Sequence, residues 1–381
     1  MFSVLILLEI LLRLYFAIKI GPDVFFYGTR FYKSVITIED RALNYAEKER
    51  NVVLHENQNN NYSKYYPHQT RFDKDVNGKR FIVTINNKGF RGIDIETRKA
   101  NNVLRIVCLG ASSTFGYGNR DQETYPYYLQ TILNADKNKI DLTRFNSIEV
   151  INLGIPHLDS EAIYYLFINE AIPLNPDIVT FYEGYNDAAI AQVGNTGITT
   201  IAKNNIRQTF RYLRIKKWLL TAKLMNELFR NKVSRYDWQY YLNYNKGRSE
   251  FLINNLSLIN KTCKDNNIRF YVITQQSKSF LLPENKMKGI SYEEEVRIVT
   301  NKIQKEPITI SELRFLVSSI LMESVRKWAK DNNIILIDGI RILNNDRDCL
   351  ASHVHLTPKG NYKLAEEIAR VIILTYKTPE T

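Results

Sequence analysis

The stretch VCLGASSTFGYG, residues 107–118, closes an apolar run with a glycine and follows it with two serines and a threonine. It belongs to a set of short, strand-like apolar runs separated by amphipathic segments: LRIVCLG (104–110), IEVINLG (148–154), DIVTFYEG (177–184), IRFYVITQ (268–275) and NIILIDG (333–339). Such an alternation is typical of βαβ units, whose parallel strands are covered by helices on both faces. The sequence therefore predicts a three-layer α/β/α sandwich around a five-stranded, mainly parallel sheet.

The first three of these runs each end in a glycine where the chain is expected to leave the sheet. In an open parallel sheet, ligands bind at the carboxyl ends of the strands. The residues directly after those glycines are therefore the first candidates for chemistry: 111–114, 155–160 and 185–187.

The glycine pattern of the first loop excludes several common sites. A P-loop requires a lysine after its second glycine, but Gly116 is followed by Tyr117. A dinucleotide fingerprint cannot be placed on Gly110, Gly116 and Gly118, and Thr114 stands where a nucleophile elbow has its second glycine. What remains is a Gly-x-Ser-x-Thr turn at the end of a strand.

Four motifs, in order along residues 104–376, resemble the blocks of the SGNH hydrolases, also called GDSL lipases and esterases. They are the turn with Ser112, the glycine Gly154 after the next strand, Gly-Tyr-Asn-Asp with Asn186, and VHLTPKGN with His355. The resemblance implies a flavodoxin-like SGNH fold in which Ser112 is the nucleophile and His355 its base. It also implies an oxyanion hole formed by the N–H groups of Ser112 and Gly154 and the side-chain amide of Asn186.

These residue types suit acyl transfer on physical grounds. A serine hydroxyl is a weak nucleophile at neutral pH and needs a base, for which histidine has a suitable pKa. Donors fixed in advance around the developing oxyanion lower the barrier. The missing side chain of Gly154 is expected to let substrate approach its N–H closely. This chemistry requires no metal ion and no organic cofactor.

Two positions depart from the family pattern. Ala111 stands where the family often has Asp, although relatives vary there. Ser352 stands three residues before His355, where the family usually has the Asp that orients the imidazole and stabilises its charged form. The groups that remain open as substitutes are a backbone carbonyl at 350–352, Ser352 itself, Asp346 and Asp348.

Composition narrows the class of protein further. A chain of 381 residues, 44% of them apolar, is long enough for a large core. The formal net charge is +12, but no nucleic-acid recognition motif accompanies it, so no nucleic acid is expected as a partner. The three cysteines lack metal-ligand spacing, and Cys108 and Cys263 are expected to be buried. His353 is expected at the surface.

The predicted organisation has three parts. They are an N-terminal segment 1–21, an extension 22–100 with a strand and turn at 81–90, and a hydrolase domain 101–376 with an insertion at about 190–250. Within the insertion, residues 203–235 carry ten basic side chains and one acidic one, interleaved with apolar residues. This pattern predicts amphipathic helices that either form a lid or a surface for anionic lipid or polysaccharide, or pack on the domain.

The N-terminal segment MFSVLILLEILLRLYFAIKIG is apolar apart from Glu9, Arg13 and Lys19. Its length suits a bilayer crossing, and Glu9 and Arg13 are four residues apart, so they can pair on a helix. A signal peptide fits less well because a basic start and a small-x-small cleavage site are missing. The segment is predicted to be a membrane anchor, with a surface-lying or buried helix as the alternative, and the side of the membrane stays open.

The sequence thus predicts a membrane-associated serine esterase or O-acyltransferase of a bacterial envelope. Its predicted substrate is an acyl ester carried by a glycan, such as an acetylated polysaccharide, or by a lipid. The alternative is a catalytically impaired SGNH-fold protein that binds a glycan or a partner protein. Ser352 favours that alternative, whereas the joint presence of Ser112, Gly154, Asn186 and His355 favours the enzyme.

Overall fold

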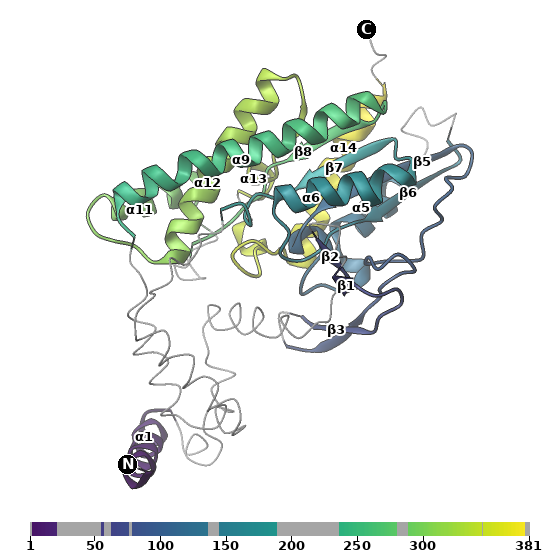
Figure 1. Ribbon diagram of the computed structural model, residues 1–381. Helices are drawn as coiled ribbons and strands as arrows, with labels where there is room; N and C mark the ends of the chain where they lie inside the picture. Colours follow the sequence, from purple (N-terminus) through teal and green to yellow (C-terminus); the bar gives the residue numbers. More distant parts are fainter. Residues whose placement is uncertain are drawn as a thin grey trace. The chain divides into compact units, whose positions relative to one another are not determined.

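The computed structural model describes residues 2–20, 55–56, 62–75, 78–135, 145–188, 236–279, 289–344 and 346–377. The chain forms two compact units: Met1–Asn51 with Ile190–Arg235, and Val52–Ala189 with Tyr236–Thr381. The described part of the first unit is helix α1 (Phe2–Ile20). All other described elements belong to the second unit (Figure 1).

Helix α1 confirms that the N-terminal segment is helical. The Arg13 Nε donates to Glu9 Oε1 at 2.8 Å, so the expected pair forms. Among the residues that the structure describes, no helix combines the length and the apolar character that a membrane crossing requires. The membrane anchor predicted for residues 1–21 stays a prediction.

The second unit is built on five strands in the order β6-β5-β7-β8-β9. Their bounds are β5 (Val103–Gly110), β6 (Ser147–Asn152), β7 (Ile178–Tyr182), β8 (Arg269–Ile273) and β9 (Ile335–Ile337). Every neighbouring pair is parallel. This order is the flavodoxin-like one, in which the first strand of the sheet lies between the second and the third. The predicted fold class and all five predicted strands are confirmed.

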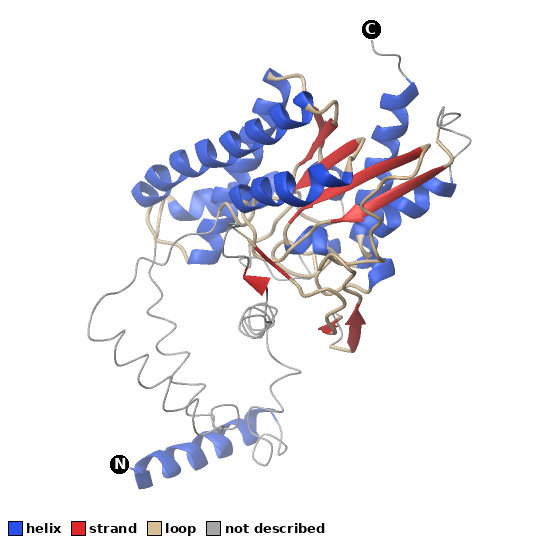
Figure 2. Ribbon diagram, turned by 45° about the vertical axis from the view of Figure 1, so that its right-hand side comes forward, coloured by secondary structure: helices blue, strands red, loops and turns tan. Residues whose placement is uncertain are grey.

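Helices cover both faces of the sheet (Figure 2). One face carries α5 (Tyr125–Ala135), α13 (Gly339–Leu343) and α14 (Pro358–Lys377). The other face carries α6 (Ser160–Leu166), α9 (Trp238–Asp265) and α12 (Ile310–Asp331). Helix α11 (Tyr292–Ile303) packs against α12. Alternate residues of β5, among them Leu104 and Cys108, form one core with Leu129 of α5 and Ile368 of α14. Cys108 and Cys263 are buried as predicted.

Short helical elements complete the second unit. They are α4 (Ser112–Phe115), η2 (Asp121–Glu123), the π-helical η4 (Phe167–Ala171), η5 (Ile172–Leu174) and η7 (Arg347–Cys349). The basic stretch 203–235 lies outside the described residues. The end of the predicted insertion is described and contains the start of α9 at Trp238. The predicted domain boundaries stay predictions.

The chain before the sheet contributes two small antiparallel pairs. Strand β1 (His55–Glu56) pairs with β2 (Ser63–Lys64), and β3 (Arg71–Lys74) pairs with β4 (Arg80–Val83). The strand and turn predicted at 81–90 are confirmed, since β4 leads to a turn in which the Gly89 N–H donates to Asn86 O at 3.0 Å. The φ of Gly89 is +82°, a conformation that favours glycine.

Candidate active site

Ser112 is presented by a tight turn directly after β5. The strand ends at Gly110, and Ser112 opens the one-turn helix α4. A Cβ at Gly110 would lie 2.1 Å from Thr114 Oγ1 and 2.6 Å from Tyr182 O. Glycine is therefore required at this position for the chain to turn from the sheet into α4 beside β7.

The structure brings His355 to Ser112 across 243 residues of sequence. His355 Nε2 lies 2.8 Å from Ser112 Oγ. On the other side of the ring, Ser352 Oγ lies 2.8 Å from His355 Nδ1. The predicted pair of hydroxyl and imidazole is thus in hydrogen-bonding contact, and a second hydroxyl stands at the nitrogen that an Asp would contact in the family pattern.

Ser352 is held by the backbone of its own loop. Its Oγ accepts the N–H of His355 at 3.1 Å and that of Val354 at 3.4 Å. For His355 to accept a proton at Nε2, Nδ1 must carry its own proton and donate it to Ser352 Oγ. A neutral hydroxyl can orient the ring in this tautomer, but it lacks the negative charge that would stabilise an imidazolium.

The two aspartates considered as substitutes lie elsewhere. Asp346 receives hydrogen bonds from Lys359, at 2.8 Å, and from Lys363. These two lysines lower the pKa of Asp346 to about 2. Asp348 is exposed in η7. Of the side chains proposed to orient His355, the structure therefore places Ser352 against the ring.

Gly154 is required by the packing around the turn of Ser112. A Cβ there would lie 2.2 Å from the backbone N of Phe115, so the glycine permits close packing of this loop against α4. Its N–H donates to Asn152 Oδ1 at 2.9 Å, and Asn152 Nδ2 donates to Thr114 O at 2.9 Å. That the missing side chain also lets substrate approach the N–H stays a prediction.

Asn186 lies in the loop after β7 and is fixed on three sides. Its backbone N–H donates to Glu183 Oε1 at 2.8 Å, and its Nδ2 donates to Leu158 O at 2.9 Å. Its Oδ1 accepts from Arg314 Nη2 of α12 at 3.1 Å. An amide Nδ2 carries two protons, so the one not given to Leu158 is available to an oxyanion.

Two buried carboxyl groups flank Asn186. Asp187 accepts hydrogen bonds from the hydroxyl of Ser160, at 2.6 Å, and from its N–H. Burial raises the pKa of Asp187 to about 6. Burial likewise raises the pKa of Glu183 to about 7. The last residue of the Gly-Tyr-Asn-Asp motif therefore anchors the loop to the start of α6.

Gln275 connects three loops of the site, and the sequence did not single it out. Its Nε2 donates to Ser113 Oγ at 3.1 Å, and its Oε1 accepts the Tyr185 N–H at 2.9 Å. Ser113 Oγ in turn donates to Val354 O at 3.2 Å. Gln275 follows β8, so its position at the carboxyl end of a strand was the feature of the sequence that could have indicated a role in the site.

Two aromatic contacts involve the histidines of the last motif. Tyr117 stacks on His355 with ring centroids 5.1 Å apart and planes at 24°. His353 stacks on Tyr185, and its Nδ1 lies 3.1 Å from Lys278 O. Burial lowers the pKa of His353 to about 3, so this ring is neutral at physiological pH. His353, which was predicted at the surface, is partly buried.

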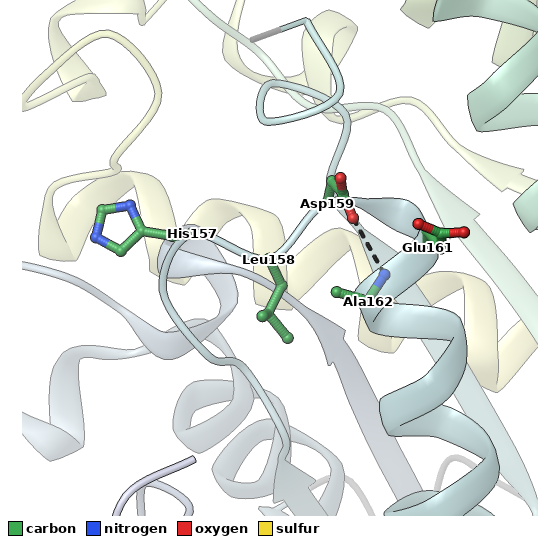
Figure 3. A pocket seen from close by; sticks show the side chains of 5 residues that line it. All are labelled: His157, Leu158, Asp159, Glu161 and Ala162. Atoms are coloured by element: carbon green, nitrogen blue, oxygen red, sulfur yellow. Dashed lines mark hydrogen bonds between the residues drawn. The ribbon is translucent and has the colours of Figure 1, made fainter. Parts of the chain in front are cut away.

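A pocket of about 530 Å³ adjoins the Asn186 side of the site (Figure 3). It is lined by His157, Leu158, Asp159, Glu161 and Ala162. Leu158 belongs to both regions, because its carbonyl accepts the Asn186 amide. Asp159 accepts the Ala162 N–H at 3.1 Å and so caps α6.

One group of possible metal ligands occurs in the part of the chain that the structure describes. Asp346, Asp348 and Cys349 have ligand atoms within 4.8 Å of one another. Both carboxylate oxygens of Asp346 already accept from lysines.

Among solved structures, the chain is similar to a lipase/acylhydrolase from Enterococcus faecalis, at 15% identity and a TM-score of 0.39, over 73% of this chain and 98% of that one. It is also similar to an aryl esterase from M. smegmatis, at 14% identity and a TM-score of 0.39, over 70% of this chain and 97% of the other. An acetyl xylan esterase matches at 15% identity and a TM-score of 0.42, over 71% of this chain and 100% of its own. No curated protein sequence matches the chain.

A family model for the GDSL-like lipases and acylhydrolases matches residues 106–368, which include the turn of Ser112, the loop of Asn186 and His355. This match spans more than half of the chain. The chain therefore belongs to the GDSL-like lipase/acylhydrolase family, whose general activity is ester hydrolysis.

Proposed function

We propose that this protein is a serine esterase in which Ser112 and His355 form and release an acyl-enzyme. The observation that carries the proposal is the line of contacts from Ser112 Oγ to His355 Nε2 and from His355 Nδ1 to Ser352 Oγ, both 2.8 Å. A nucleophile, a base and a group that orients the base are the three parts that nucleophilic catalysis requires.

The chemical steps follow from these contacts. His355 Nε2 takes the hydroxyl proton as Ser112 Oγ attacks the ester carbonyl carbon, and the carbonyl oxygen becomes an oxyanion. Collapse of this intermediate breaks the bond to the alcohol oxygen, which leaves with the proton from His355. His355 then takes a proton from water, whose oxygen attacks the acyl carbon. Collapse releases the carboxylic acid and returns the proton to Ser112.

Oxyanion stabilisation is assigned to donors around Ser112. The free proton of Asn186 Nδ2 is the best-supported donor, because Arg314 and Leu158 fix the orientation of the amide. The backbone N–H of Ser112 is the second. The N–H of Gly154 is the third, and it must exchange its bond to Asn152 for one to the oxyanion.

We propose that the substrate is an acyl ester of a glycan or a lipid. In a variant of the same mechanism, an acceptor hydroxyl takes the acyl group in place of water. Helix α1 exposes large apolar side chains, among them Leu7, Leu11 and Ile18. We propose that it associates with a membrane surface, which would bring the enzyme to such substrates.

The test uses the full chain with short-chain acyl ester reporters and a fluorophosphonate probe. Ser112→Ala is expected to abolish labelling and to lower kcat on the order of 10⁶-fold, leaving only the residual catalysis that binding and oxyanion donors provide. Ser352→Asp should raise kcat/KM about tenfold, since a carboxylate accepts the same backbone N–H groups and adds the missing charge. Ser352→Ala should lower it.

Failure of the wild-type chain to turn over reporters and to label at Ser112 would contradict the proposal. Binding of acetylated oligosaccharide that survives Ser112→Ala, in the absence of any turnover, would instead favour a glycan-binding protein. Ser352 is the observation behind that second candidate, because the group at His355 Nδ1 is a neutral hydroxyl where the family pattern has an Asp.

A further inference from the structure

Ser352 stands where the family pattern has a carboxylate, so the group at position 352 does not itself stabilise a positive charge on His355. When Ser112 gives up its proton, His355 becomes positively charged. Ser352 meets Nδ1 with a neutral hydroxyl. A second side chain also faces the imidazole: the ring of Tyr117 is stacked on it, with centroids 5.1 Å apart.

We propose that Tyr117 is a positioning residue for His355 whose ring face also stabilises the imidazolium, so that it supplies part of what the missing carboxylate would provide. This inference rests on the proposed function, because it concerns the proton that His355 takes from Ser112. It assigns a role to a residue outside the motifs by which the chain resembles its family.

The physical basis is the charge distribution of an aromatic ring. The face of a tyrosine ring is negative, and a cation within about 6 Å of its centroid is attracted to it. The ring planes differ by 24°, so the imidazole lies over the face of Tyr117 rather than at its edge. The neutral imidazole gains less from this contact than the imidazolium. The contact therefore favours the charged state that forms during catalysis.

The backbone around Tyr117 fixes the ring in place. The Tyr117 N–H donates to Ser112 O at 3.0 Å, which ties the residue to the nucleophile itself. Gly116 and Gly118 on either side have φ of +83° and +76°. The Gly118 N–H donates to Asp73 Oδ2 at 3.0 Å. The stack is therefore held by the same turn that presents Ser112.

Other charged and titratable groups also surround the pair. Arg71 has its guanidinium carbon 6.0 Å from the Tyr117 centroid, Asp73 binds the neighbouring Gly118, and His353 is neutral because burial lowers its pKa to about 3. Ser112 and Ser352 contact the ring nitrogens. All of these groups are kept in the variants below, so a change in the titration of His355 reports on the ring at position 117.

The first experiment is an NMR titration of the histidine ring protons in the full chain, which needs no turnover. The chain has five histidines, and the signal of His355 is assigned by its loss in His355→Gln. In Tyr117→Leu the midpoint of this signal is expected to fall by about 0.5 to 1 pH unit, because the protonated ring loses its cation–π partner. In Tyr117→Phe, which keeps the ring face, it should stay within about 0.2 units.

A control variant separates a general loss of packing from the proposed effect. Tyr128→Leu removes an aromatic contact with Tyr362, whose centroid is 5.4 Å away, and leaves His355 with its own stack. The His355 midpoint should not move in this variant. An unchanged midpoint in a folded Tyr117→Leu chain would overturn the proposal.

A second substitution keeps the test decisive if Tyr117→Leu does not fold. Fluorinated phenylalanine at position 117 weakens the negative ring face while leaving the ring shape nearly unchanged. The His355 midpoint should then fall stepwise with the number of fluorines, and a constant midpoint would contradict the proposal. If the proposed esterase activity is present, kcat should fall about three- to tenfold in Tyr117→Leu, with little change in KM. Absence of turnover with the midpoint shift intact would remove the esterase proposal alone.

Discussion

The environment of Glu183 disfavours the ionised form of its carboxyl group. This residue directly precedes the Gly-Tyr-Asn-Asp loop and is 2% exposed. Burial, reinforced by the charge of Asp187, raises its pKa from 4.5 to about 7, although Arg314 and two backbone N–H groups act in the opposite direction. The folded protein therefore holds the proton more tightly than the unfolded chain, and ionisation of Glu183 destabilises the fold.

Glu183→Gln is predicted to change how stability depends on pH. Between pH of about 4.5 and 7 the native wild-type chain binds more protons than the unfolded chain, so its free energy of unfolding falls through this group as pH rises. The glutamine cannot ionise, and its Oε1 can still accept the Asn186 N–H. The free energy of unfolding of the variant should therefore rise relative to that of the wild type across this window, by up to about 3 kcal/mol above pH 7.

Urea denaturation at pH 5 and pH 8 measures this difference. Asp187, whose pKa is raised to about 6, titrates in both proteins and largely cancels in the comparison. If the free energy of unfolding changes equally between pH 5 and pH 8 in wild type and in Glu183→Gln, the ionisation of Glu183 costs little stability.

At the residue scale the sequence was informative where chemistry follows a strand end. Ser112 and His355 were predicted to interact, and they lie in contact. Ser352 was among the groups named for orienting the ring. Gln275 and Tyr117 were not predicted, because their roles depend on side-chain register between segments that only the folded chain brings together.

At the scale of elements, helix α12 contacts the loop of Asn186 through Arg314. Arg314 Nη2 donates to Asn186 Oδ1 at 3.1 Å and to Tyr185 O at 2.9 Å, and its guanidinium carbon lies 4.0 Å from the centroid of the Tyr185 ring. An arginine that donates to Oδ1 leaves only one orientation for the amide, with Nδ2 toward Leu158. Arg314 is therefore expected to position Asn186.

Arg314→Met is predicted to lower kcat about tenfold, with little change in KM, because an oxyanion donor acts on the transition state. Arg314→Lys should restore part of the loss, since one amine can replace one of the donors. Arg326→Met is the matched control: Arg326 also lies on α12 but pairs with Asp338, at 2.8 Å. Equal effects of the two methionine variants would mean that α12 acts only through stability.

The elements themselves were predictable because hydrophobic pattern is a local property. All five sheet strands overlap the predicted apolar runs. Nearly all residues of β5 and β7 are buried, as parallel strands covered on both sides require. The contact between α12 and the loop after β7 was not predictable. Arg314 and Asn186 are separated by 128 residues, and the sequence around an arginine on a helix does not indicate which residue the arginine will contact.

At the scale of the whole molecule, the segment 52–102, which precedes the five-stranded sheet, belongs to the same unit as Ser112 and His355. Arg91 is buried and donates to the carbonyls of Phe115 and Gly116, both at 2.9 Å, and to Asn119 O at 2.6 Å. It also pairs with Asp121 at 2.8 Å. One side chain from this part of the chain thus satisfies three carbonyls of the turn that follows Ser112.

Arg91→Met in the full chain is predicted to lower the free energy of unfolding by about 3 kcal/mol or more, because it leaves buried carbonyls and a carboxylate without their donor. It should also lower kcat/KM, since the displaced turn carries both Ser112 and Tyr117. A chain reduced to 101–381 loses Arg91 together with β3 and β4, and should be neither stable nor active. Wild-type kcat/KM in 101–381 would show that the turn holds its shape without Arg91.

Removal of residues 1–21 should leave turnover of short-chain esters unchanged and abolish sedimentation with anionic lipid vesicles. Vesicle binding that persists in 22–381 would locate the membrane contact outside α1.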